Sequence, residues 1–511
     1  MQKLIQSKWI LPFVSGVLTF IAVGHINFIL GWICFVPLFV KVINQPAKAS
    51  FRSGFIFGSA ITIFGFYWMI PGAERFTGNS IFYGIGVYII SVAFFAVWCG
   101  LVTFCFSFLK MQQKQKMALA DNAILAGAVF CGGEALLMLV SAGFPWFDFH
   151  AGNALAQNLY AIQPAAYFGV FVITFIVVVV NYLIAGIVAD KEWKKLWLPV
   201  AVSVCYMLVG FFILLQFEKQ VSAEKQFSVA ILAENIPPEM KWDDNTGDML
   251  VQRLLNLNRE AVKLQPEVAL WSESAIPWTY RSDDDLVNEI LKITAPAHIT
   301  HVMGINTEFA ANEVFNSAYC LLPDGKVSSR YDKQFLLTLI EKPVGGMVIP
   351  FFSSKGFYAK NDTVYNKPLN TGYGKAGVMI CNEATVPQAA HNMAVNGAQF
   401  LFNLSNDGWF NDTYIVGLHF YNARLRAVET RKDIVINSNN GMSGFVQASG
   451  KIVMQKISEE PYTEKVTVQP NNYKSLVIKS PYLFVYTCLI YMGCLWVLRI
   501  FNKKQQFSKP A

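Results

Sequence analysis

Eight apolar stretches, each long enough to span or nearly span a lipid bilayer, constrain most strongly what this 511-residue chain can fold into. A helix needs about 20 apolar residues to cross the hydrocarbon core. Seven stretches precede a long polar region and one follows it, at 9–23, 27–43, 54–70, 81–108, 122–141, 164–188, 196–217 and 482–501. We predict a polytopic α-helical membrane bundle of about eight spans. The first two stretches are short and closely joined, so a re-entrant pair is the alternative to two full spans.

Basic residues between the apolar stretches indicate the orientation. Outside residues 218–479, 15 of the 16 Lys and Arg residues lie in alternate connecting segments, and only Arg75 lies in the other set. Because cytoplasmic loops are enriched in Lys and Arg, both termini are predicted to be cytoplasmic and the polar region to face outward. That region holds 25 basic and 28 acidic residues, so the net charge of +7 reflects topology rather than nucleic-acid binding. No cleavable signal peptide is expected.

The polar region changes to short β-rich runs that alternate with helical ones, the pattern of a single layered α/β domain. Turn residues at 323–325 and 448–450 predict two hairpins. We divide the chain into a seven-helix transmembrane bundle at 1–219, an α/β domain at 220–478, and a last helix with a cytoplasmic tail at 479–511. Strands are predicted at 227–235, 267–272, 301–306, 317–322, 326–331, 375–380, 398–404 and 433–438, and helices at 246–264, 283–295, 384–396 and 413–431.

Three of the predicted strands end at a reactive side chain that a turn follows. Glu273 follows VALWS, Lys333 follows SSRYD, and Cys381 follows VMI. A strand fixes the backbone while the turn exposes the side chain. A thiol nucleophile needs a base, and acyl transfer needs a cation or N–H groups for its oxyanion. Glu, Lys and Cys supply these roles, although spacing alone does not separate them from ordinary surface residues.

Cys381 differs from most of the nine cysteines in its setting. Seven lie in apolar stretches, where cysteine usually acts as a small hydrophobic residue. Cys320 lies in a predicted strand, and a Cys320–Cys381 disulfide is the alternative to a free thiol. No metal site is expected, because His298 and His301 straddle the start of a strand and no further ligand cluster follows.

The residues around the three side chains resemble the nitrilase superfamily, whose Glu-Lys-Cys triad hydrolyses or transfers acyl groups. The resemblance rests on LWSESAIP, RYDKQFL, VMICNEATVP and NLSNDGWF. With the flanking apolar stretches, the chain is similar over nearly its whole length to the apolipoprotein N-acyltransferase family, on GFPW, GNALAQ, ENIPPEMKW and NARLRAVETRKDIVINSNNG. This resemblance implies that residues 220–478 form a periplasmic nitrilase-like α-β-β-α sandwich that carries the catalytic groups.

The resemblance also implies roles for single residues. Cys381 would be the nucleophile, Glu273 the general base and Lys333 the cation that stabilises the oxyanion. The backbone N–H of Asn382 would be a second oxyanion donor, although Asn382 stands where an aromatic residue is more usual.

Further residues match positions with supporting or binding roles in that family. Glu341 and Glu383 would be supporting carboxylates. Trp242 and Asn316 match positions linked to substrate handling or active-site support, and packing and turn formation are the alternatives for these two. Glu134 lies in the fifth apolar stretch, where a carboxylate needs a partner, and a structural hydrogen bond is favoured over recognition of a lipid head group.

The resemblance implies an acyltransferase of the bacterial inner membrane that acts as a monomer without metal or organic cofactor. It would move a fatty acyl chain from a glycerophospholipid, typically phosphatidylethanolamine, to the N-terminal α-amino group of diacylglyceryl-cysteine in apolipoproteins. A thioester on Cys381 and ping-pong kinetics would follow. A membrane-tethered amidase and a non-enzymatic ligand-binding domain are the alternatives. The apolar stretch 335–352 would be a lid with a hinge at 345–346, or would pack on the helices.

Overall fold

The computed structural model describes residues 8–77, 81–110, 118–220, 225–310, 313–343, 357–358 and 365–507. Each of the eight predicted apolar stretches contains helix. The helices of this part are α2 (Ile10–Gly24), α3 (Phe28–Gly31), α4 (Val36–Val42), α5 (Ala47–Gly65), α6 (Met69–Thr77), α7 (Ile81–Leu109), α8 (Ala118–Val140), α9 (Ala165–Phe168), α10 (Phe171–Asp190), α11 (Trp197–Gln220) and α17 (Leu483–Phe507).

Four helical segments within the described residues are long and apolar enough to cross a membrane, which is fewer than the eight predicted. They are α7, α8, α10 and the segment Trp193–Gln220 that ends in α11. Ile10–Gly24, Phe28–Val42 and Leu483–Leu498 are apolar but shorter. The second stretch breaks into α3 and α4, and Pro37 lies in the first turn of α4. Proline lacks an N–H and suits only the first turn of a helix, so α4 starts there anew.

The polar region forms two β-sheets. One has nine strands, with the order β15-β1-β2-β4-β5-β8 and with β3, β6 and β7 paired beside that path, and the other has the order β14-β13-β12-β11-β10-β9. The strands are β1 (Phe227–Ala233), β2 (Val268–Leu270), β3 (Ile276–Thr279), β4 (Thr300–Ala310), β5 (Glu313–Phe315), β6 (Ser317–Leu321), β7 (Val327–Asp332), β8 (Phe357–Tyr358), β9 (Leu369–Asn370), β10 (Lys375–Ile380), β11 (Phe400–Asn406), β12 (Ile434–Asn439), β13 (Met442–Val446), β14 (Ile452–Ile457) and β15 (Tyr462–Val468).

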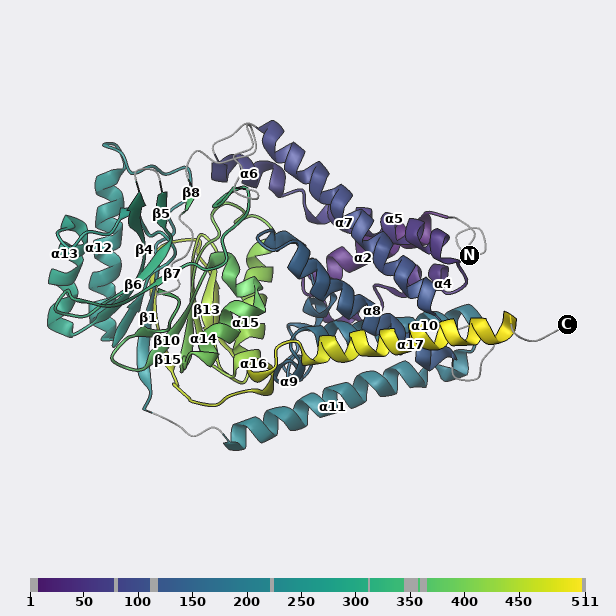
Figure 1. Cartoon of the computed structure of the whole chain (residues 1–511). Coiled ribbons are helices and arrows are strands. Elements are labelled where there is room, and N and C mark those ends of the chain that lie inside the picture. Colours follow the sequence, from purple (N-terminus) through teal and green to yellow (C-terminus); the bar gives the residue numbers. More distant parts are fainter. Residues whose placement is uncertain are drawn as a thin grey trace.

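Side chains alternate along the strands and so build a layered α/β domain. Val229 and Ile231 of β1 lie in the core between the two sheets. Ala230 and Leu232 lie in the core beneath α12 and α13. Figure 1 shows α12 and α13 on the side away from the membrane helices, with α14 and α15 between the sheets and those helices. The domain helices are α12 (Gly247–Leu264), α13 (Asp285–Thr294), α14 (Pro387–Val395) and α15 (Ile415–Thr430).

Both predicted hairpins are confirmed, since β6 pairs antiparallel with β7 and β13 with β14. The predicted disulfide alternative is wrong, because Cys320 and Cys381 are free thiols.

Helix α15 fastens the α/β domain to the helical part through buried polar groups. The Arg424 guanidinium donates to the carbonyl oxygens of Ala156 and Gln157, at 2.7 and 2.8 Å. The Glu429 carboxylate accepts from the backbone N–H of Val170, at 2.9 Å. Buried acceptors and charges need such partners, so these bonds fix the domain against the segment between α8 and α10.

Candidate active site

Cys381 lies just past β10 and opens a short 3-10 helix, Cys381–Thr385. Its backbone has a φ of 53°, in the left-handed region, and Ser274 beside Glu273 has a φ of 50°. Non-glycine residues in this region are uncommon and concentrate at functional sites. Cys381 is half-buried, so the sharp turn presents its thiol at the edge of the sheet without exposing it fully.

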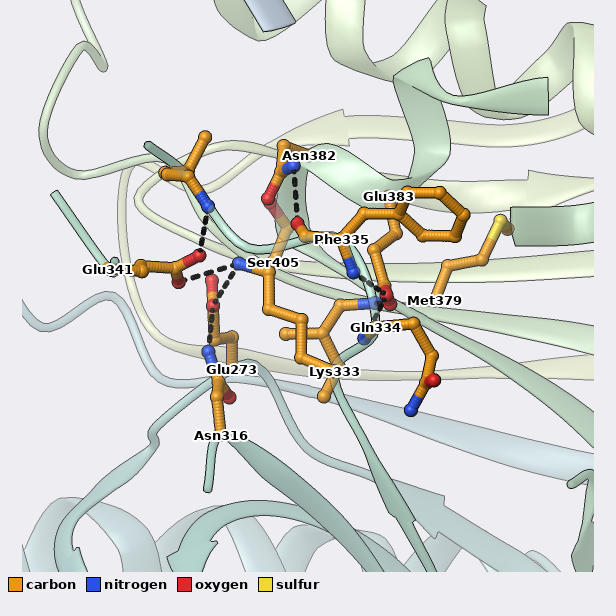
Figure 2. A network of polar contacts seen from close by, with 12 residues as sticks. Glu273, Asn316, Lys333, Gln334, Phe335, Glu341, Met379, Asn382, Glu383 and Ser405 are labelled. Carbon is orange, nitrogen blue, oxygen red and sulfur yellow. Dashed lines mark hydrogen bonds and ion pairs between the residues drawn. The ribbon is translucent and has the colours of Figure 1, made fainter. Parts of the chain in front are cut away.

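The structure brings Glu273, Lys333 and Glu341 together, as Figure 2 shows. Lys333 Nζ lies 2.8 Å from Glu341 Oε1 and 3.6 Å from Glu273 Oε1. Asn316 Nδ2 donates to Glu273 Oε1 at 2.8 Å, and the backbone N–H of Lys333 donates to Asn316 O at 2.8 Å. Asn316 is therefore a direct neighbour of the triad, and its position favours a supporting role over simple turn formation.

Burial and neighbouring charges shift the pKa values of Glu273, Lys333 and Cys381. Burial raises the pKa of Glu273, while the neighbouring Lys333 ammonium lowers it. Burial would lower the pKa of Lys333, but the carboxylates of Glu341 and Glu273 outweigh it and raise that pKa well above its ordinary value. Burial and then the charge of Glu273 raise the pKa of the Cys381 thiol well above its ordinary value. Lys333 is thus a fixed cation, and Cys381 rests as a thiol that needs a base to react.

Glu383 braces the two loops that carry Lys333 and Cys381. One of its carboxylate oxygens accepts from the backbone N–H groups of Gln334 and Phe335, at 2.7 and 3.1 Å. The other accepts from the N–H of Ile380 at 2.7 Å, and the Tyr331 hydroxyl donates to both oxygens at 2.9 Å. Because Glu383 is buried and fully engaged, its geometry is that of a structural carboxylate.

Asn382 and Glu341 also hold loops in place. Asn382 Nδ2 donates to Phe335 O at 3.0 Å, and Leu337 N donates to Glu341 Oε2 at 2.7 Å. From the same loop, Thr338 N donates to Gly143 O at 2.7 Å. This first part of the apolar stretch 335–352 therefore packs against the helical part. Residues 344–352, including the predicted hinge at 345–346, lie outside the described residues.

A large apolar cavity opens beside Cys381. It encloses about 1040 Å³, its open mouth included. The helical part supplies one wall, whose residues include Trp68, Met69, Tyr83, Val87, Trp146, Asp148 and Phe149. The domain supplies the other wall, whose residues include Leu337, Leu339, Ile340, Cys381, Asn382, Trp409, Phe410, Tyr414, Leu418 and His419. Such a cavity suits a long apolar ligand.

Trp242 and Glu134 lie elsewhere. Trp242 packs edge-on against Trp278, with ring centroids 5.2 Å apart, in the core beneath α12. This contact favours the packing alternative.

Glu134 makes the predicted structural hydrogen bonds, with Thr174 Oγ1 at 2.7 Å and the N–H of Ala151 at 2.8 Å.

Asp407 and His419 form a polar pair that lies outside the predicted triad. Asp407 follows β11 directly, and its Oδ1 lies 3.1 Å from His419 Nδ1. Ser405 Oγ donates to the same oxygen at 2.9 Å. The strand-end rule that selected Cys381 missed Asp407, because the strand was predicted to end at 404 and β11 extends to Asn406. His419 on α15 carries no comparable sequence signal.

The α/β domain is similar to the carbon–nitrogen hydrolase class, because the family model "Carbon-nitrogen hydrolase" matches residues 231–476, the segment that carries Glu273, Lys333 and Cys381. A second model, "Apolipoprotein N-acyltransferase N-terminal domain", matches residues 15–183. The carbon-nitrogen hydrolase of Helicobacter pylori G27 is 16% identical with a TM-score of 0.38, over 51% of this chain and 95% of that chain.

Full-length relatives extend the likeness across both parts. The apolipoprotein N-acyltransferase of Geobacter metallireducens is 24% identical over 433 residues, which is 83% of this chain and 82% of the relative. That of Haemophilus ducreyi is 27% identical over 405 residues, 76% of each chain. The chain is therefore recognised as a relative of the apolipoprotein N-acyltransferases, and it is an acyltransferase and a bacterial membrane protein.

Proposed function

We propose that this acyltransferase moves a fatty acyl chain from a glycerophospholipid, typically phosphatidylethanolamine, to the N-terminal α-amino group of diacylglyceryl-cysteine in apolipoproteins. The observation that carries the proposal is the apolar cavity between the helices and the domain, which has Cys381 in its wall. A nucleophile beside such a cavity is suited to substrates with long acyl chains. The curated relatives named apolipoprotein N-acyltransferases support the choice of acceptor.

In the first half-reaction, Cys381 attacks the ester carbonyl of the phospholipid. Glu273 accepts the thiol proton, the carbonyl C–O bond breaks, and the proton passes to the oxygen of the departing lysophospholipid. The oxyanion is stabilised by the Lys333 ammonium and the backbone N–H of Asn382. Glu341 and Asn316 position Lys333 and Glu273, and the product is a thioester on Cys381.

In the second half-reaction, the neutral α-amine of the acceptor attacks the thioester. The new C–N bond forms, the C–S bond breaks, and a proton returns to the Cys381 sulfur through Glu273. Because the lysophospholipid leaves before the amine attacks, the kinetics are ping-pong.

We further propose that the enzyme is a monomer and that its chain spans the inner membrane with about eight helices. Residues 1–219 and 479–511 form the membrane parts, and both termini are cytoplasmic. Residues 220–478 form the periplasmic catalytic domain. The alternation of basic segments supports this topology. So does the arrangement in Figure 1, where α17 runs along the other helices and ends on the side away from the sheets.

Trapping the intermediate tests the proposal. The purified full-length protein is incubated with phosphatidylethanolamine carrying a labelled acyl chain, and is then given a diacylglyceryl-cysteine lipopeptide. We expect a hydroxylamine-sensitive label on Cys381, followed by transfer of one acyl chain to the peptide amine. Cys381→Ser should abolish both steps, whereas Cys494→Ser, at an exposed cysteine of α17, should retain them. Label that is released only as free fatty acid would mean that water, not the peptide amine, is the acyl acceptor, and would contradict the transferase proposal.

A further inference from the structure

Asp407 and His419 stand in the wall of the proposed active site but are outside its triad. His419 lines the same cavity as Cys381. Its Nδ1 is 3.1 Å from Asp407 Oδ1, which also accepts from Ser405. The Phe410 ring packs edge-on against the imidazole, with centroids 5.1 Å apart. Within the part of the chain that the structure describes, Nε2 has no hydrogen-bond partner.

In the second half-reaction, the acceptor amine carries one more proton than Glu273 can transfer to the departing sulfur. The acceptor is an α-amine, which ordinarily carries a proton below a pH of about 8. An ammonium has no lone pair, so one proton must leave before the C–N bond can form. A second proton leaves the nitrogen during attack and passes through Glu273 to the departing sulfur. A further base at the site would remove this proton from the bound acceptor, whereas without one only the neutral fraction of the acceptor reacts.

We propose that His419 is this base. Its Nε2 takes one proton from the bound ammonium, the freed amine attacks the thioester, and imidazolium then releases the proton to water. Asp407 is the positioning residue, since its bond to Nδ1 fixes the ring and leaves Nε2 for the substrate. This role rests on the proposed function, because it concerns the amine step alone.

The surroundings of His419 are compatible with a transient positive charge. Asp407 is almost completely buried and faces the imidazole directly. The other titratable side chains that line the cavity are Tyr83, Asp148, Cys381 and Tyr414. No Lys or Arg is among the described residues that line it. An Asp–His pair in such a setting is a common general-base arrangement.

The two half-reactions allow a direct test. The acyl-enzyme is formed first, and transfer is then timed with the lipopeptide amine at pH 7 and pH 9 and with hydroxylamine at pH 7. Hydroxylamine is already neutral at pH 7, so it needs no base to free its lone pair. His419→Asn is compared with His298→Asn, an identical change at an exposed histidine of the domain, and with Asp407→Asn.

For His419→Asn we expect the lipopeptide transfer rate, divided by the acylation rate of the same variant, to fall about 6- to 10-fold at pH 7, because an α-amine with a pKa of about 7.7–8.0 is only about 10–17% neutral at that pH. At pH 9, where the amine is mostly neutral, the loss should shrink to about threefold or less. Asp407→Asn should show a smaller loss with the same recovery, and His298→Asn none.

Equal losses with lipopeptide and hydroxylamine, or a loss unchanged at pH 9, would show that His419 is only structural and would overturn the inference. Normal lipopeptide transfer at pH 7 would do the same. If the wild-type protein forms no acyl-enzyme, the proposed function fails, and this inference fails with it.

Discussion

In the proposed reaction, Glu273 must be ionised before Cys381 can attack. Burial raises the pKa of Glu273, and the Lys333 charge and the Asn316 amide oppose that rise. The thiol pKa of Cys381 lies well above 9.0, so little thiolate forms at neutral pH. The base, rather than the thiol, therefore sets the pH dependence of acylation.

We predict that the acylation rate falls as pH drops through the raised pKa of Glu273, above the ordinary glutamate value of about 4.3. The rate should then stay level up to about pH 9, because the thiol does not ionise in that range. Asn316→Ala removes a bond that lowers the pKa of Glu273 and should move the acidic limb to higher pH. The check is the pH profile of Cys381 labelling. A rate that keeps rising between pH 7 and 9 would indicate reaction through a free thiolate instead.

Among the elements, α15 connects the membrane part to the catalytic domain. The motif NARLRAVETR served only as a family resemblance in the sequence, because the membrane-side partners of Arg424 lie 267 and 268 residues away along the chain. Arg424 bonds the carbonyl oxygens of Ala156, Gln157 and Gly450. Cys381, Glu273 and Lys333 could be predicted from the sequence, because a strand followed by a turn is a local pattern. The long-range bonds of Arg424 and the cavity could not, because they depend on how distant segments pack together.

Arg424→Met should lower the thermal stability of the detergent-solubilised protein. The change leaves three carbonyl acceptors without their donor, and buried unpaired groups cost about 1–3 kcal/mol each. We expect a loss of about 3 kcal/mol or more in the free energy of unfolding, seen as a lower melting midpoint. The matched change Arg281→Met, at an exposed arginine, should leave the midpoint within error. Equal midpoints for the two variants would contradict the anchoring role of α15.

At the scale of the whole molecule, the number of membrane-crossing helices decides on which side of the membrane the catalytic domain lies relative to the basic segments. Charge alternation predicted one orientation from sequence, yet helix length alone supports only four spans within the described residues. The shortness of α2 was visible in the sequence, but the break between α3 and α4 at Pro37 could not be predicted from hydropathy, which measures composition and not where a helix begins and ends.

Labelling of single introduced cysteines tests the orientation. Lys326→Cys lies in the exposed turn between β6 and β7, and Lys194→Cys lies in the exposed segment between α10 and α11. In spheroplasts, a membrane-impermeant maleimide should label Lys326→Cys at once and Lys194→Cys only after lysis, above the background of the native cysteines. The reverse pattern would place the domain in the cytoplasm.

The brace formed by Glu383 has a consequence for how such a site can diversify. Three of its partners, at Gln334, Phe335 and Ile380, are backbone N–H groups. Every amino acid except proline supplies an N–H, so a substitution at any of these three positions keeps its backbone bond to Glu383. Position 383 itself has no such freedom, because only a carboxylate of this length accepts all of these bonds. The position of the nucleophile therefore depends on one side chain, Glu383, and on the course of the backbone around it, rather than on the identity of its neighbours.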